Sequence, residues 1–109
     1  MATLFKNKIV KNVGTSSTTV ISIATDSKVT VVGLSLTNLT DCVVTASLTV
    51  TDSTNVTGYY AKDIIIPPNG SARVVNGGEK LMLPGNNVLK VSANTVDSID
   101  AIVSYIEIV

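Results

Sequence analysis

The side chains that could carry chemistry are few, and they do not form a recognisable catalytic set. The sequence contains no histidine and one cysteine, Cys42. Histidine is the commonest general base, the usual activator of a nucleophile and a frequent metal ligand. A Ser-His-Asp or Cys-His arrangement is therefore impossible within these residues, and we expect no enzyme activity.

The acidic residues do not have the spacing of a metal site. Five of them lie in or near predicted loops: Asp26, Asp41, Asp52, Asp97 and Asp100. Asp97 and Asp100 could approach a hard cation, but the dense spacing of a calcium loop is missing, and turn formation is the simpler role. Zinc would need Cys42 with carboxylates alone. Gly77 and Gly78 precede no helix start, so they predict a turn and not a phosphate loop. We predict no metal and no cofactor.

The tyrosines offer a weak ligand site. Tyr59, Tyr60 and Tyr105 could stack against a sugar or single-stranded nucleic acid. Such a platform needs basic residues beside it, and only Lys62 and Arg73 are candidates. Packing in a core or an interface is the alternative that we favour. We expect no nucleic-acid partner, and a host-receptor or carbohydrate-binding module is the least favoured function.

Charge gives no reason to expect an electrostatic partner. Eight basic and eight acidic residues give a formal net charge of zero, so no global field attracts nucleic acid or an anionic membrane. Charged residues make up 15% of the chain, against about 25% in an ordinary domain. This composition fits a protein packed against other subunits. A monomeric sandwich with threonine and serine on its exposed faces remains the alternative.

Composition and pattern predict an all-β fold. Valine, threonine and isoleucine number 17, 14 and 10 of 109 residues, and these residues pack well on a pleated surface. We expect residues 1–109 to form a single antiparallel β-sandwich of seven to nine strands, immunoglobulin-like or jelly-roll in strand order. The strands are predicted over residues 8–13, 18–24, 28–37, 42–51, 57–66, 71–75, 88–93 and 99–109, with a brief apolar segment at residues 81–83.

Residues 28–51 have the clearest pattern, and we expect the rest of the chain to be organised around them. They are predicted to form two strands of a hairpin, closed by a turn from Asn38 to Asp41. In the second strand every other residue from Cys42 to Val50 is apolar, so one face is committed to a core. Cys42 is therefore predicted to be a small buried hydrophobe. Such a hairpin needs a second apolar layer.

The N-terminal segment is positively charged. Residues 1–8 contain Lys6 and Lys8, and the first acidic residue of the chain is Asp26. One interpretation is an N-terminal arm over residues 1–8 that crosses onto a neighbouring subunit. Leu4 and Phe5 would anchor it, and Lys6 and Lys8 would meet an acidic surface. The interpretation that we favour is an edge strand whose lysines discourage pairing with another sheet.

Two strands are apolar on both faces, which is typical of strands that are covered on both sides. Residues 57–66 end in three isoleucines. In residues 99–109, one face of the strand carries Ile102, Ile106 and Ile108, and the other face carries Ile99, Ala101 and Val103. We therefore predict an interface formed by Leu4, Phe5, Lys6, Lys8, Tyr59, Tyr60, Ile65, Ile106 and Ile108.

The N-terminus lacks the apolar segment of a signal peptide, and no run approaches the ~20 apolar residues of a membrane span. We expect no contact with a membrane, and synthesis and folding in a cytoplasm.

The order of features in the C-terminal half resembles small virion proteins of tailed bacteriophages. The segments that carry the resemblance are YYAKDIIIPPNGS (59–71), VNGGEKLML (75–83), PGN (84–86), LKVS (89–92) and IVSYIEI (102–108). It covers the chain from about Val13 onward. It implies a short sandwich without catalytic residues, located in the virion after synthesis in the host cytoplasm.

Proteins of this group serve as capsid decoration (cement) proteins or as neck, tail and baseplate components. The resemblance therefore implies a virion structural protein, and we expect a decoration protein in the first place. Its partners would be the major capsid protein or other virion proteins. A symmetric homo-oligomer such as a trimer is also expected.

Overall fold

The computed structural model describes residues 2–75 and 80–109, and within them it contains nine strands and no helix. The strands are β1 (Thr3–Val13), β2 (Thr18–Ser22), β3 (Lys28–Asn38), β4 (Val44–Thr51), β5 (Thr57–Ile66), β6 (Ser71–Val75), β7 (Leu81–Leu83), β8 (Val88–Ala93) and β9 (Ile99–Ile108). Their bounds lie within two residues of the predicted ones, except that β1 begins five residues earlier. The turn predicted at Gly77 and Gly78 lies outside the described residues. No helix suited to crossing a membrane is found in the described part of the chain.

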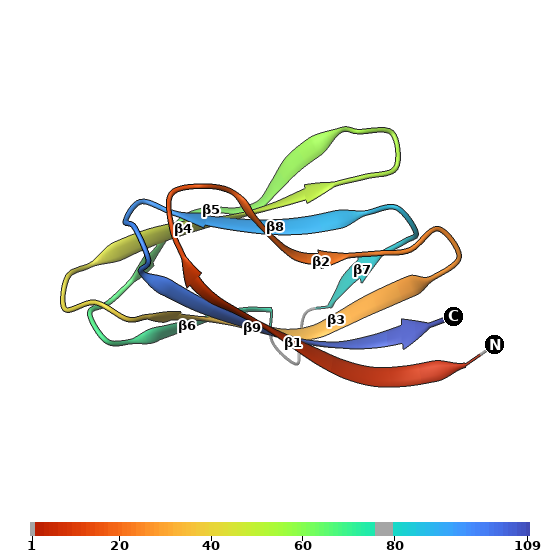
Figure 1. Cartoon of the computed structure of the whole chain (residues 1–109), viewed down its shortest axis with the longest axis horizontal. Helices are drawn as coiled ribbons and strands as arrows, with labels where there is room; N and C mark the ends of the chain where they lie inside the picture. Colours follow the sequence, from red (N-terminus) through yellow and green to blue (C-terminus); the bar gives the residue numbers. More distant parts are fainter. Residues whose placement is uncertain (1, 76–79) are drawn as a thin grey trace.

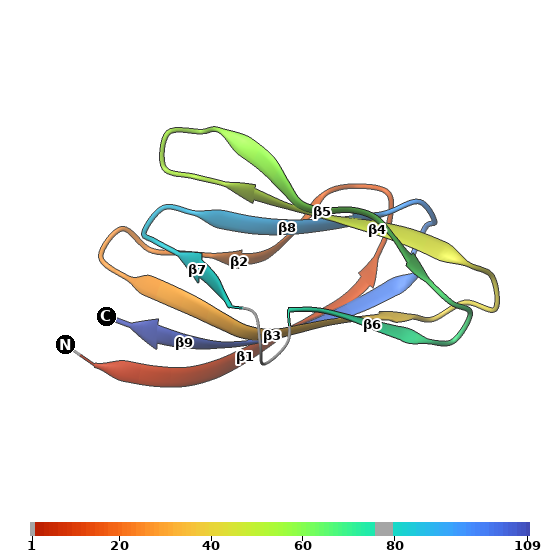
Figure 2. The same ribbon diagram turned by 180° about the vertical axis from the view of Figure 1, so that it is seen from behind.

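The strands form two antiparallel sheets that pack face to face (Figures 1 and 2). Sheet A has the order β1-β9-β3-β6, with the short β7 also pairing with β3. Sheet B has the order β2-β8-β4-β5. The prediction of an all-β antiparallel sandwich with seven to nine strands is confirmed.

The strand order is that of a jelly roll. The pairs β1·β9, β2·β8, β3·β6 and β4·β5 are successive parts of one long antiparallel ladder, whose closed end is the loop between β4 and β5. The ladder wraps around a core so that β9 also pairs with β3 and β8 also pairs with β4. Consecutive strands from β1 to β4 therefore alternate between the sheets, which is the jelly-roll arrangement and not the immunoglobulin one.

This topology corrects the predicted hairpin in residues 28–51. The two strands are present, but β3 lies in sheet A and β4 lies in sheet B, so they do not pair with each other. Each strand has one buried face, as its alternation indicates, and the two faces meet across the core. Alternation reports that a strand has a core side, but it does not report the neighbour to which the strand is hydrogen-bonded.

The segment between β3 and β4 crosses from one sheet to the other and is held by Asn38. The Asn38 side chain is buried, and its Nδ2 lies 2.8, 3.2 and 3.1 Å from the carbonyl oxygens of Cys42, Ile66 and Pro67. Its Oδ1 accepts hydrogen bonds from the backbone N–H and the hydroxyl of Thr40. One amide therefore connects the end of β3 to the end of β5 in the other sheet.

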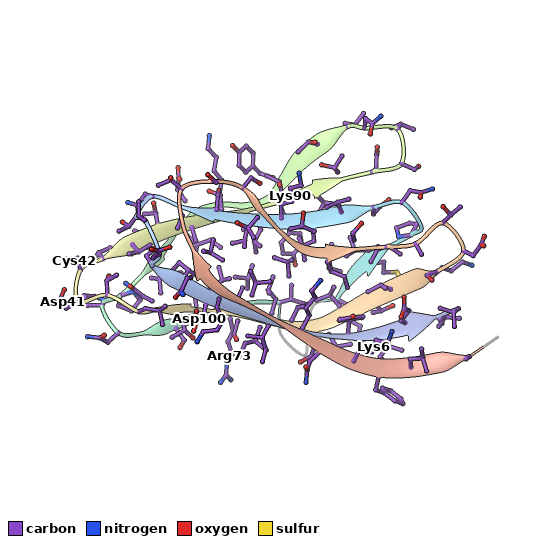
Figure 3. The ribbon with its side chains drawn as sticks, viewed as in Figure 1. Lys6, Asp41, Cys42, Arg73, Lys90 and Asp100 are labelled. Carbon is purple, nitrogen blue, oxygen red and sulfur yellow. The ribbon has the colours of Figure 1, made fainter. Side chains whose placement is uncertain are left out.

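The prediction for Cys42 is wrong. Cys42 lies in this crossing segment, two residues before β4 begins, and its thiol is exposed (Figure 3). Because the strand alternation starts only at Val44, it says nothing about the side on which Cys42 lies.

The core lies between the sheets and is filled mainly by branched aliphatic residues. Residues with a relative exposure of 2% or less include Val20, Val31, Leu34, Leu36, Val44, Leu48, Ile66, Leu89, Val91, Ile99, Ala101 and Val103. They come from strands of both sheets, so each sheet covers the apolar face of the other.

Residues 3–8, considered above as an arm or an edge strand, belong to β1 at the edge of sheet A. They pair in unbroken register with β9, from Thr3 opposite Ile108 to Lys8 opposite Val103. Ala2 and Val109 also exchange backbone hydrogen bonds of 3.0 and 2.9 Å. The first and last described residues therefore lie side by side at one end of the sandwich (Figure 1).

Candidate interaction surface

The outer face of sheet A, which points away from the core, carries large apolar side chains. In β1 these are Phe5 and Ile9, which are 82% and 60% exposed. Phe5 lies opposite Ile106 of β9, and Ile9 lies opposite Ile102. On this face Phe5, Ile9 and Ile102 are exposed and Ile106 is half-buried, with Asn7 and Ser104 between them, whereas an isolated sheet would normally present mainly polar side chains.

The cross-strand rows continue over β3 to β6 and β7. Ile106 is followed by Thr30 of β3 and then by Met82 of β7, which is 73% exposed. In the parallel row, Ile102 is followed by Ser35 and then by Arg73 of β6. We call the six apolar residues on this side of the sheet the apolar face: Phe5, Ile9, Met82, Ile102, Ile106 and Ile108.

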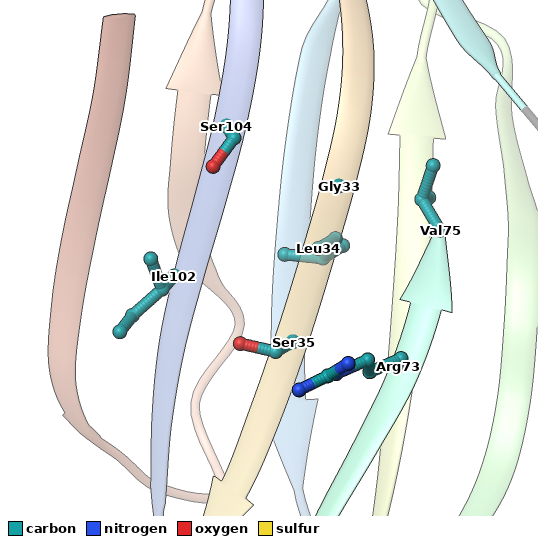
Figure 4. Close-up of a pocket in the computed structure, with 7 residues that line it drawn as sticks. All are labelled: Gly33, Leu34, Ser35, Arg73, Val75, Ile102 and Ser104. Atoms are coloured by element: carbon teal, nitrogen blue, oxygen red, sulfur yellow. The ribbon is translucent and has the colours of Figure 1, made fainter. Parts of the chain in front are cut away.

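Two shallow hollows interrupt this side of sheet A. The first has a volume of about 260 Å³ and lies over β9, β3 and β6 (Figure 4). Its lining consists of Gly33, Leu34, Ser35, Arg73, Val75, Ile102 and Ser104. The small residues Gly33 and Ser104 are paired across β3 and β9, and they lower the surface there. The second hollow, of about 290 Å³, lies beside Met82, Thr30 and Ile108.

The outer face of sheet B has the opposite character. The row Thr19, Lys90, Thr49 and Tyr59 crosses all four strands, and it consists of two threonines, one lysine and one tyrosine, so every side chain in it carries a polar or charged group. Within the strands of sheet B, the large apolar side chains that are exposed lie in the edge strand β5, where Tyr59 and Ile65 are 61% and 69% exposed. Val43 and Val56, which flank the strands, are exposed as well. In Figure 3, the label of Lys90 marks sheet B, and the Arg73 side chain extends from sheet A in the direction away from sheet B. The two outer faces of one sandwich therefore differ in polarity.

The predicted interface residues fall on three different surfaces. Phe5, Ile106 and Ile108 lie together on the apolar face, but Tyr59 and Ile65 lie on sheet B. Tyr60 points to the other side of β5 from Tyr59 and packs against the core. The remaining three, Leu4, Lys6 and Lys8, lie on the side of β1 that is opposite to Phe5.

Three members of the apolar face were not among the predicted residues: Ile9, Ile102 and Met82. For Ile9 and Ile102 the sequence does contain a signal, because each lies on the same face of its strand as a predicted residue. Ile9 is four positions from Phe5 in β1, and Ile102 is four positions from Ile106 in β9. For Met82 there is no local signal. Its place depends on the pairing of β7 with β3, which brings together residues about fifty positions apart.

Lys6, one of the two lysines in residues 1–8, has a partner within the fold. Lys6 Nζ lies 2.7 Å from Glu107 Oε1, across the β1–β9 pair. The hydrogen bond from Lys6 to Glu107, together with the negative charge of that carboxylate, raises the pKa of Lys6 above its usual value. Lys6 is therefore engaged in holding the edge strand. Lys62 is similarly engaged, because its Nζ lies 5.1 Å from the centre of the Tyr59 ring.

Metal-binding groups are not assembled in the described part of the chain. No three of its histidine, cysteine, aspartate or glutamate side chains come together as a metal site would require. Of the acidic pair considered above, the Asp100 carboxylate accepts a hydrogen bond of 3.0 Å from the backbone N–H of Asn12. Asp97 has a φ of 50°, which is typical of a turn.

No family model and no curated protein matches the chain. Solved structures do resemble it. A chain of the Bacillus endospore appendages, described as a novel family of disulfide-linked pili, has a TM-score of 0.57 and 7% identity, over 96% of this chain and 86% of that one. A chain of the acid-stable capsid of Helicobacter pylori bacteriophage KHP30 has a TM-score of 0.52 and 9% identity, over 100% and 89%.

A pentameric capsid protein isolated from metagenomic phage sequences has a higher identity, 23%, but a TM-score of 0.43, over 94% of this chain and 59% of that one. At such identities the likeness to the pilus and KHP30 chains shows a shared fold.

Proposed function

We propose that this chain is a non-enzymatic structural subunit of a phage particle, and specifically a capsid decoration protein that stabilises the assembled shell. The observation that carries the proposal is the apolar face on one side of the sandwich. Six large apolar side chains on one sheet surface form a surface for contact with protein, and the described residues assemble no metal centre that would suggest chemistry.

The charge of the chain supports contacts of this kind. With a formal net charge of zero, the protein experiences little self-repulsion, and its association depends mainly on buried apolar area. Many copies can then lie close together on one shell without a large electrostatic penalty.

Two independent likenesses support the virion location. The C-terminal segments resemble small virion proteins of tailed phages, and the jelly-roll fold is shared with a chain of the KHP30 capsid. A decoration protein acts by mass action, because it binds the assembled shell more tightly than its separated pieces and so raises the free energy of disassembly. Its partners would be the major capsid protein and further copies of itself.

A second candidate function is a subunit of a surface fibre. It is favoured by the likeness to the disulfide-linked endospore appendages and by the exposed thiol of Cys42. However, one cysteine can join only two copies, so these 109 residues cannot by themselves form a continuous disulfide-linked fibre. We therefore favour the virion role.

The copy number of the chain in purified particles of the phage that encodes it tests the proposal. Quantitative mass spectrometry against the major capsid protein should give a ratio near one or a simple fraction of it. Particles that lack the protein should release DNA at a lower temperature than complete particles. A few copies per particle would replace the decoration role by a neck, tail or baseplate role, and absence from all particles would overturn the virion assignment.

A further inference from the structure

We infer that the apolar face binds the same face of a second copy of this chain, across a two-fold axis that runs along the row Asn7, Ser104 and Gly33. These residues are paired across β1, β9 and β3. The inference concerns the same surface as the proposed function, but it does not depend on the virion role.

Four of the six residues of the apolar face are arranged symmetrically about this row. In β1, Phe5 and Ile9 each lie two residues from Asn7, and in β9, Ile106 and Ile102 each lie two residues from Ser104. A two-fold axis along the row places Phe5 of one copy opposite Ile9 of the other. It likewise places Ile106 opposite Ile102. Phe5, Ile9, Ile102 and Ile106 then each meet an apolar partner, which is the self-complementarity that an isologous interface requires. Ile108 is the exception, because it lies four residues from Ser104 and the axis places it opposite Asp100.

The polar residues of β3 follow the same symmetry. A bulge between Val31 and Gly33 places Thr30 in the row of Ile106 and Ser35 in the row of Ile102. The axis therefore brings Thr30 of one copy opposite Ser35 of the other, so that two hydroxyl groups meet and neither is buried against an aliphatic side chain.

Met82 and the first hollow occupy matching places. β6 and β7 both pair with the same edge of β3, with Arg73 in the row of Ser35 and Met82 in the row of Thr30. The axis carries Met82 of one copy to the place above Arg73 of the other, beside the hollow of about 260 Å³. A methionine side chain adapts well to an irregular hollow of this size.

The charges on this side of sheet A are compatible with the pairing. Lys28 lies at one end of β3 and Asp100 lies at the other end of the sheet, beside Thr37. The axis places Lys28 of one copy opposite Thr37 of the other. Thr37 pairs with Asp100 on the neighbouring strand of that same copy, at a strand spacing of about 5 Å. Lysine and aspartate therefore come within reach of each other twice per dimer, and Arg73 faces Met82 instead of a second cation.

The area suffices for a specific dimer. Four strands at a spacing of about 4.8 Å and ten residues at about 3.3 Å give a face of about 19 by 33 Å. Pairing two such faces buries about 1,200 Å² in total, which is at the lower end of stable protein interfaces.

Sedimentation equilibrium of the purified chain and of two matched variants tests the inference. The wild-type protein should be dimeric. Phe5→Glu should raise the dimer dissociation constant at least about 100-fold, because each dimer contains two changed residues. Ile65→Glu is the control, since Ile65 is also an exposed apolar residue of an edge strand but lies on sheet B. It should leave the dimer intact. A wild-type protein that is monomeric at about 0.5 mM, or equal effects of the two variants, would overturn the inference.

Cysteine cross-linking tests the axis itself, in a Cys42→Ser background. Ser104→Cys alone should form a dimer linked by a short bismaleimide, because residue 104 meets its own counterpart on the axis and facing sheets lie about 10 Å apart, too far for a direct disulfide. Thr30→Cys and Ser35→Cys should cross-link efficiently only when the two variants are mixed. Thr49→Cys on sheet B should not cross-link. Absence of a Ser104 cross-link in a dimeric, folded protein would overturn the axis. Failure of the dimer leaves the virion assignment untouched, and absence from virions leaves the dimer untouched.

Discussion

Lys6 Nζ donates a hydrogen bond of 2.7 Å to Glu107 Oε1, and this contact joins the first and the last strand of the sandwich. The two residues are 101 positions apart in the chain. The N-terminal lysines that suggested an arm thus lie in a strand that closes one edge of sheet A.

Deletion of residues 1–8 should therefore destabilise the isolated protein. The truncation removes most of β1 and exposes the backbone edge of β9. We expect the melting temperature to fall by at least about 5 °C, measured by circular dichroism or calorimetry. An unchanged melting temperature would mean that these residues behave as a free arm.

Replacement of Asn38 should be among the costlier polar substitutions. Asn38→Asp keeps the size and the acceptor oxygens, but it removes the donors that reach three carbonyl oxygens and introduces a buried charge. We expect a loss of about 2–4 kcal/mol in the free energy of unfolding by denaturant titration. Asn69→Asp makes the same chemical change at an exposed turn and should cost less than about 0.5 kcal/mol. Equal costs would contradict the bridging role of Asn38.

The turn before β8 requires glycine. A Cβ atom on residue 85 would lie 2.4 Å from the backbone oxygen of Thr25, whereas a Cβ atom on Gly58 would meet nothing within 4 Å. Gly85→Ala should therefore destabilise the protein by at least about 1–3 kcal/mol, because a backbone segment must shift. Gly58→Ala should be nearly neutral or slightly stabilising. Denaturant unfolding of both variants decides the matter, and a neutral Gly85→Ala would contradict the close approach.

Asp52 organises the loop between β4 and β5, and its titration reports on that loop. The Thr54 hydroxyl donates a hydrogen bond of 2.6 Å to the Asp52 carboxylate, and the backbone N–H groups of Val56 and Thr54 donate two more. These bonds lower the pKa of Asp52 below its usual value of 3.8. A depressed pKa means that the ionised carboxylate stabilises the fold above the unfolded-state pKa, and this contribution is lost as the pH falls through the folded-state pKa.

NMR titration of the Asp52 carboxyl group in two variants measures this effect. Thr54→Ala should raise the pKa of Asp52 toward 3.8, because the strongest donor is removed. Thr54→Ser keeps the hydroxyl and should leave the pKa low. If both variants titrate alike, the hydroxyl is not the cause.

Strand positions could be predicted closely from the sequence, because alternation and turn residues are local signals. The pairing of those strands could not. Residues 28–38 and 44–51 have the pattern of a hairpin, yet they separate into two sheets because the intervening segment crosses the core edge and Asn38 holds it there. The same crossing leaves Cys42 exposed.

The candidate surface could be predicted in part. Phe5, Ile106 and Ile108 belong to strands whose outer residues are apolar, and this pattern is visible without a structure. Their separation from Tyr59 and Ile65 depends on the assignment of β5 to sheet B, and the contribution of Met82 depends on β7 pairing with β3. Both are long-range facts, so no window of local sequence contains them.

The central claim is that the apolar face of sheet A is buried when the protein assembles. Hydroxyl-radical labelling of Met82, read by mass spectrometry, tests it most directly, because Met82 is 73% exposed in the single chain and its thioether is readily oxidised. Met82 should be oxidised rapidly in the Phe5→Glu variant and several-fold more slowly in the assembled wild-type protein. Equal oxidation rates in both would show that this face stays open to solvent, and the account would be wrong.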